Sequence, residues 1–180
     1  MVVSNNDVRN TVKSYVDANP ADGRCLGPLL DLLADAIDVT DRDELRGHVT
    51  ASAVVINAFG LVLLVRHLAS GLWTQPGGHL QHEDDTVAVA AMRELAEKTG
   101  IQRNQVELVT PEPIQIFRHT TPTRTSAGGP AHLHFDFRFV FCTTAEVTRL
   151  RVSEVDAAVW ATPEQLPNAV LRDRVLALPS

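Results

Sequence analysis

The segment HLHFDFRFVF, residues 132–141, alternates strictly between polar and apolar side chains and most constrains what this chain can fold into. A period of two is the pattern of a β-strand whose two faces meet different surroundings. The apolar face of this strand carries Leu133, Phe135, Phe137, Phe139 and Phe141. The segment therefore predicts a strand in a sheet with at least one buried face.

The other patterns place this strand in a mixed fold. Residues 48–68 form two β-rich runs broken at Asn57–Gly60, which predicts a hairpin. One amphipathic helix is expected from about Asp85 to Thr99, and a second strand-rich stretch follows it. A strand over VDAAVWA and one or two short helices end the chain. Because strands and helices do not alternate regularly, we expect a mixed α+β fold, an α/β sandwich.

Residues 1–46 differ from the rest in having only helical patterns. Apolar side chains recur at helical spacing in two stretches, Val8, Val12, Tyr15 and Val16 in the first and Leu29, Leu30, Leu33 and Ile37 in the second. We therefore expect residues 1–46 to be a helical N-terminal extension and residues 47–180 to form the main domain.

Composition excludes several classes of protein. The formal net charge of −6 and the pI of about 5.6 argue against a nucleic-acid polymer as partner, because no basic surplus displaces phosphate counterions. No apolar run approaches the ~20 residues that span a bilayer, and the N-terminus lacks the pattern of a signal peptide. We expect a cytoplasmic protein without membrane contact. Cys25 and Cys142 are expected to be reduced and buried.

The stretch GGHLQHEDDTVAVAAMRELAEKTGI, residues 77–101, combines a glycine-rich loop with a carboxylate-bearing helix. Glu94 and Glu97 are three residues apart and lie on one helix face. Gly77 and Gly78 let the backbone approach whatever lies opposite. Carboxylates facing such a loop suit magnesium, which prefers oxygen ligands and shares them with phosphates. A solvated acidic helix face is the alternative.

This stretch resembles the Nudix box, the signature loop–helix–loop of the Nudix hydrolases. The matching residues are Gly78, Arg93, Glu94, Leu95, Glu97, Gly100 and Ile101. HVTASAVVI, WTQPGGH, HLHFDFRF and SEVDAAVW extend the resemblance over about residues 47–166, to a poorly characterised bacterial subgroup. The resemblance implies a Nudix α/β/α sandwich with a mixed sheet. It also implies Mg²⁺- or Mn²⁺-dependent cleavage of a diphosphate bond in a small nucleoside-diphosphate-linked or related compound.

The chain departs from the Nudix box at two points. Its loop is one residue longer, so the first acidic position falls on Asp84 when counted from Gly78 and on Asp85 when counted from Arg93. We expect Asp85 to brace the loop by pairing with Arg93. The second departure is Lys98, which stands where the family carries a glutamate metal ligand and changes the local formal charge by +2.

Lys98 lies four residues after Glu94, a spacing that favours an ion pair. Such a pair at ~4 Å is worth on the order of 4 kcal/mol before screening, and a loss of ~1.4 kcal/mol weakens metal binding tenfold. We expect weaker magnesium binding or fewer ions. Alternatively, Lys98 points outward, or the Gly77 carbonyl and a late acid compensate. The resemblance supplies that acid as Glu154.

The resemblance implies roles for these residues. Glu94, Glu97 and Gly77 would hold the metal, Glu94 or Glu154 would act as base, and Arg93 would orient the loop. The alternative function is a catalytically weakened Nudix protein that binds a ligand or acts as a sensor, and Lys98 favours it. A homodimer through the N-terminal helices is compatible with either function.

Substrate contacts are expected from Trp73, His132, His134 and Arg138. Trp73 can stack on a base but is equally compatible with a core position. The two histidines and Arg138 share a strand face with Asp136, which can line a cleft or form a polar outer face. Two histidines with an aspartate can also ligate zinc or iron, although neighbours on one strand converge poorly on one ion. Substrate specificity is expected from loops such as residues 120–131.

Overall fold

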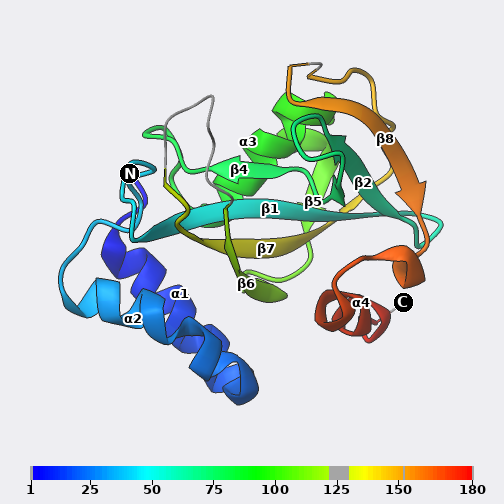
Figure 1. Ribbon diagram of the computed structural model, residues 1–180. Helices are drawn as coiled ribbons and strands as arrows, with labels where there is room; N and C mark the ends of the chain where they lie inside the picture. Colours follow the sequence, from blue (N-terminus) through cyan, green and yellow to red (C-terminus); the bar gives the residue numbers. More distant parts are fainter. Residues whose placement is uncertain (1, 122–129, 152, 180) are drawn as a thin grey trace.

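The computed structural model describes residues 2–121, 130–151 and 153–179 and shows the predicted mixed α+β fold (Figure 1). Its elements are α1 (Asn5–Ala18), η1 (Pro20–Leu26), α2 (Gly27–Ala34), β1 (Gly47–Asn57), β2 (Val62–His67), β3 (Trp73–Thr74), β4 (Gly77–His79), α3 (Val87–Thr99), η2 (Arg103–Gln105), β5 (Val106–Leu108), β6 (Gln115–Thr120), β7 (Leu133–Thr143), β8 (Val155–Ala161), η3 (Pro163–Gln165) and α4 (Ala169–Leu176).

One mixed sheet organises the molecule around β1 and β7, which run parallel along their whole length. β2 and β4 pair antiparallel with β1, β5 and β6 pair antiparallel with β7, and β3 and β8 extend the sheet from β2. The predicted hairpin is confirmed as β1–β2. Figure 1 shows α3 and α4 on opposite sides of the sheet, which confirms the α/β/α sandwich.

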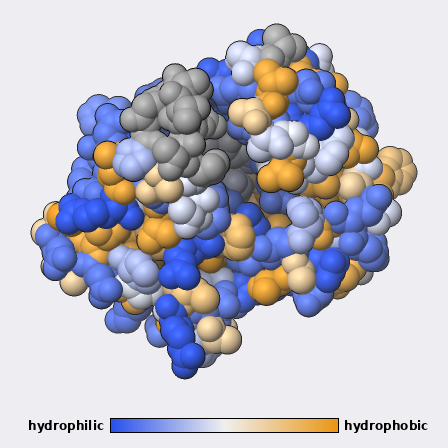
Figure 2. Space-filling view, in the orientation of Figure 1, coloured by the Kyte–Doolittle hydropathy of each residue, from blue (hydrophilic) through white to orange (hydrophobic). Residues whose placement is uncertain are grey.

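The core forms two clusters. The larger one joins α1, α2 and α3 to alternate residues of β1 and to Phe135, Phe137, Phe139 and Phe141 of β7, as the alternation predicts. The smaller one packs α4 on Val54, Leu64 and Val140 from the opposite sheet face. The face of the molecule seen in Figure 2 is largely hydrophilic, with scattered apolar patches.

The polar side of β7 is not a solvent-exposed outer face. Asp136 and Arg138 are only 6% and 8% exposed. Asp136 accepts hydrogen bonds from Ser52 on β1 (2.7 Å) and from Arg138 Nε (2.8 Å), and Arg138 Nη1 donates to Gln115 on β6 (2.9 Å). The alternative of a polar outer face is therefore wrong for these two residues, because they are buried against Ser52 of β1 and against Gln115 and Phe117 of β6.

The helices of residues 1–46 pack on the same core and are tied to the C-terminal helix. A capping box between Ser4 and Asp7 starts α1. Arg174 of α4 donates to the Tyr15 hydroxyl (2.5 Å) and to Asp22 (2.9 Å), which links α1 and η1 to α4. Both helical patterns are confirmed, although α2 ends at Ala34, before the expected Ile37. The division into an extension and a main domain stays a prediction.

The two cysteines are both exposed, so the prediction that they are buried is wrong. Cys142 lies near the end of β7 on the face opposite the phenylalanines, and Cys25 lies on η1, where Leu26 is the buried side chain. Free cysteine is more often buried, but neither position falls on the apolar face of its element. Among the described residues, no helix has the length and apolar character needed to cross a membrane.

Candidate active site

A pocket of about 860 Å³ lies between β4, the loop that follows β4, the C-terminal half of α3 and the segment before β8. Its lining includes both glycines of the predicted loop and several charged side chains, among them Gly77, Gly78, Glu94, Lys98, Arg151 and Glu154. The structure therefore brings Gly78 and Glu94 of the Nudix box to one cavity, together with Lys98 and the late acid Glu154.

The two glycines of β4 are required by close packing on both sides. β4 pairs with β1, and a Cβ added at Gly77 would lie within 2.7 Å of the carbonyl oxygen of Ala51. A Cβ at Gly78 would lie 2.4 Å from the carboxyl carbon of Glu94. Real Cβ atoms do not approach other atoms this closely, so any larger residue at Gly78 would displace the Glu94 carboxylate from the pocket wall.

Helix α3 presents its carboxylates because both of its ends are fixed. The Thr86 hydroxyl accepts from the backbone N–H of Val89 (3.1 Å) at the start, and Gly100 ends the helix in the left-handed region at φ 77°. The helix begins at Val87, two residues later than expected. With this register, Glu94 and Glu97 lie on one face, as predicted.

The loop before α3 is braced by Asp84. Arg93 donates from Nε and Nη2 to the two carboxylate oxygens of Asp84, at 3.0 Å each. Its Nη2 also donates to the carbonyl of His79 at 2.8 Å. The prediction that Asp85 is the partner is wrong: Asp85 is exposed, and the extra loop residue falls after Asp84. Burial would lower the pKa of Arg93, but the hydrogen bonds with Asp84 and Glu94 raise it.

Lys98 points into the site. Its side chain is 5% exposed, and Nζ lies 3.3 Å from Glu94 Oε2 and 2.5 Å from Glu154 Oε2. The predicted pair with Glu94 is confirmed, and the alternative of an outward-pointing lysine is wrong. Lys98 thus places a fixed positive charge between two carboxylates that the family resemblance assigns to metal binding or catalysis.

The segment before β8 reaches this site because it is hydrogen-bonded to the end of α3. The backbone N–H groups of Thr148 and Arg149 donate to the carbonyl of Thr99, and that of Arg151 donates to the carbonyl of Lys98 (3.2 Å). These backbone hydrogen bonds place Glu154 in contact with Lys98. Burial would raise the pKa of Glu154, but its hydrogen bond with Lys98 and the charges of Lys98 and Arg151 lower it below its usual value.

Arg151 is a site residue that the sequence did not single out. Its guanidinium pairs with Glu97 and lies 3.3 Å from Glu154, while Arg93 pairs with Glu94 (2.9 Å) and Glu97 (3.1 Å). The available signal was its spacing three residues before Glu154.

We call Asp84, Glu94, Glu97 and Glu154 the carboxylate cluster. Four carboxylates face three cations, Arg93, Lys98 and Arg151, so the formal charge is −1; a glutamate in place of Lys98 would make it −3.

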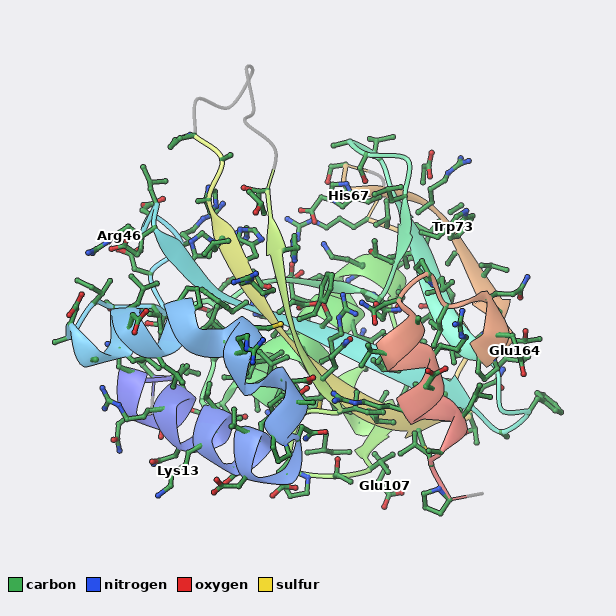
Figure 3. All side chains as sticks on the ribbon, turned by 60° about the horizontal axis from the view of Figure 1, so that its bottom comes forward. Lys13, Arg46, His67, Trp73, Glu107 and Glu164 are labelled. Atoms are coloured by element: carbon green, nitrogen blue, oxygen red, sulfur yellow. The ribbon has the colours of Figure 1, made fainter. Side chains whose placement is uncertain are left out.

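None of the four predicted substrate contacts lines the pocket. Trp73 lies on the edge strand β3 and is 37% exposed, and Figure 3 shows it at the β2–β3 edge of the sheet. The Arg66 guanidinium lies 5.9 Å from the centroid of its ring. Arg138 is held in the buried network with Asp136. His132 and His134 belong to a group of histidines that meets the pocket wall at His79.

Comparison with known proteins agrees with this geometry. The NUDIX domain family matches residues 46–178. Phosphatase NudJ of Escherichia coli K12 is 32% identical over 127 residues, which cover 68% of this chain and 72% of that protein. Among solved structures, a NUDIX-family hydrolase from Clostridium perfringens is similar with a TM-score of 0.54 and 22% identity, covering 73% of this chain and 98% of its own. A C. elegans Ap4A hydrolase is similar with a TM-score of 0.52 and 18% identity, over 71% and 92%.

The fold, the glycine-rich strand and the carboxylate helix define a Nudix-type hydrolase. The chain belongs to the NUDIX family. The resemblance found in the sequence is therefore confirmed at the level of the family.

Proposed function

We propose that this chain hydrolyses a diphosphate bond in a small nucleoside-diphosphate-linked compound, with Mg²⁺ or Mn²⁺ as cofactor. The observation that carries the proposal is that Glu94 and Glu154 line one pocket with Gly77 and Gly78. Glu97 is joined to these two glutamates through ion pairs with Arg93 and Arg151. Oxygen donors of this kind suit magnesium, and the family relationship to a protein named as a phosphatase supports hydrolysis of a phosphate compound.

The charge of the carboxylate cluster favours a single ion. At a formal charge of −1, one divalent cation makes the cluster +1, whereas the −3 of a glutamate at position 98 would accommodate two. Glu97, with 30% of its side chain exposed, and Glu94 would hold the ion with the carbonyl of Gly77. When bound, it would supply charge neutralisation for the diphosphate and lower the pKa of a bound water.

The cationic side chains would position the substrate. Lys98, Arg151 and Arg42 all line the pocket, so a diphosphate entering it would meet three positive charges. Glu154, held by Lys98 at a lowered pKa, is a weak proton acceptor in the free protein. With Lys98 bound to the diphosphate, Glu154 would keep only its contact with Arg151 and could accept the proton of the attacking water. Arg93 would keep the loop and Glu94 in place through Asp84.

A second candidate function is a Nudix-fold protein that binds a ligand or acts as a sensor without efficient hydrolysis. The observation that favours it is that every carboxylate of the cluster is already paired with a cation. Trp73, His132, His134 and Arg138 stay predicted substrate contacts, and residues 122–129 of the predicted specificity loop lie outside the described residues. A cytoplasmic location and a homodimer also stay predictions.

The test is phosphate or nucleotide release from a panel of diphosphate compounds, with magnesium or manganese and with EDTA. We expect slow, metal-dependent turnover that Glu97→Gln lowers by at least about tenfold, corresponding to ~1.4 kcal/mol of lost transition-state stabilisation. Glu107→Gln, at an exposed position on β5 outside the pocket, is the matched control and should not change the rate. Panel compounds that shift the melting temperature without being cleaved would favour the binding function instead.

A further inference from the structure

Five of the seven histidines gather at one end of the sheet, and we call His48, His79, His119, His132 and His134 the histidine cluster. Strand register creates it: His48 of β1 pairs with His134 of β7, and His119 of β6 pairs with His134 from the other side. His79 of β4 pairs with Thr50, two residues along β1 from His48. Ring centroids lie 4.6 Å apart for His48 and His134 and 5.1 Å for His79 and each of these two.

Three of these side chains have the spacing of a metal site. One ring nitrogen from each of His48, His79 and His134 lies within 4.8 Å of those of the other two. In tetrahedral zinc sites the metal–nitrogen distance is about 2.0–2.1 Å, which places ligand nitrogens roughly 3.4 Å apart. Small rotations of three side chains, two of them only partly buried, would close the difference.

The hydrogen bonding of His48 prepares it as a ligand. Its Nδ1 lies 3.0 Å from the carbonyl oxygen of Glu44 and donates to it, so Nε2 carries the lone pair. The residue is 1% exposed, and Nε2 has no hydrogen-bond partner among the described residues. An orphaned buried group costs about 1–3 kcal/mol, and a histidine whose other nitrogen donates to a carbonyl is the usual form of a metal ligand.

Electrostatics keep these rings neutral, the form that binds a metal. Burial, followed by the charges of nearby basic groups, lowers the pKa of His79 to about 4 and that of His134 to about 2. Burial also lowers the pKa of His48.

We propose that His48, His79 and His134 form a binding site for a divalent transition metal of the zinc class, distinct from the carboxylate cluster. Imidazole nitrogens suit zinc, whereas the carboxylates suit magnesium. His79 lines the same pocket as Glu94, so the metal lies at the pocket wall with a fourth position open. His132, whose Nε2 is 3.1 Å from that of His134, orients the His134 ring. The alternative metal site on one strand, made of His132, His134 and Asp136, is not formed, because Asp136 is paired with Arg138.

The experiment is a titration of the metal-stripped protein with cobalt(II), followed by its visible absorption. We expect one cobalt per chain with the intense bands of four-coordinate cobalt, displaced by one equivalent of zinc. His79→Gln and His134→Gln should each weaken binding by at least about 10–100-fold, the loss seen when even an outer partner of a ligand is removed. His82→Gln, at an exposed position outside the cluster, should bind as the unaltered chain does.

Further variants separate this site from the proposed hydrolase site. The double variant Glu94→Gln/Glu97→Gln should keep the cobalt bands while losing any magnesium-dependent activity. His48→Gln is buried and is interpreted only if its circular dichroism is native, whereas the partly exposed His79 provides the test in any case. The proposal is overturned if stoichiometric cobalt gives no four-coordinate bands. It is also overturned if the bands survive both histidine variants, or vanish only when the carboxylates are changed.

Discussion

Replacing Lys98 with glutamate is the perturbation whose result follows most directly from the structure. The Lys98–Glu94 pair at 3.3 Å has a Coulomb energy on the order of 5 kcal/mol at an effective dielectric of 20, and the substitution turns this attraction into repulsion. Much of that energy is offset by the desolvation penalty that the buried pair carries and by rearrangement of the site in the variant. Breaking a buried pair costs about 3–5 kcal/mol, so we expect the free energy of unfolding in EDTA to fall by about 3 kcal/mol.

Magnesium should reverse this loss in the variant, and it should stabilise the unaltered chain less than the variant. A ligand at 100 times its Kd stabilises the folded state by about 2.7 kcal/mol, which is close to the expected deficit. The assay is thermal unfolding with and without magnesium, combined with calorimetric titration. We expect Lys98→Glu to bind magnesium at least tenfold more tightly, because each 1.4 kcal/mol corresponds to a factor of ten.

Two controls isolate the position and the charge. Lys13→Glu makes the same change of charge at an exposed position on α1 and should leave magnesium affinity unchanged (Figure 3). Lys98→Met removes the cation without adding a ligand and should give an intermediate affinity. Equal magnesium affinity in the unaltered chain and in Lys98→Glu would refute the assignment of Lys98 to the metal position.

Two further predictions concern packing and pH. Gly78→Ala should abolish magnesium binding and hydrolysis, because its Cβ displaces Glu94. Gly27→Ala should be neutral in the same assays, because no described atom outside its own stretch of helix lies within 4 Å of the added Cβ. In EDTA, stability should fall as the pH drops from about 6.5 toward 4: the depressed pKa values of His79 and His134 mean that the unfolded chain binds more protons in this window. The denaturant midpoint measured across this range tests it, and a flat profile would contradict it.

Local patterns in the sequence were enough to predict much of the fold and part of the site. The strict alternation of residues 132–141 specifies β7, and the Glu94–Lys98 pair follows from helical spacing alone. The choice between Asp84 and Asp85 could not be made locally, because it depends on where the loop accommodates one extra residue. Only the geometry of the folded loop decides that Arg93 meets Asp84.

The histidine cluster could not be predicted from the sequence, for a different reason. His48 and His134 are 86 residues apart and become neighbours only because β1 and β7 pair in parallel with one register. A shift of one residue would send their side chains to opposite faces. Arg151 was missed similarly, since its role depends on the docking of residues 148–151 onto the end of α3.

The rate of diphosphate hydrolysis at limiting magnesium should be compared between the unaltered chain and Lys98→Glu, because it shows whether the site hydrolyses substrate with the lysine in place. We expect measurable, magnesium-dependent turnover by the unaltered chain, with Lys98→Glu reaching its full rate at a lower magnesium concentration. Hydrolysis that appears only after Lys98→Glu would contradict this expectation, because the natural site would then be a binding site in which the lysine has replaced catalysis.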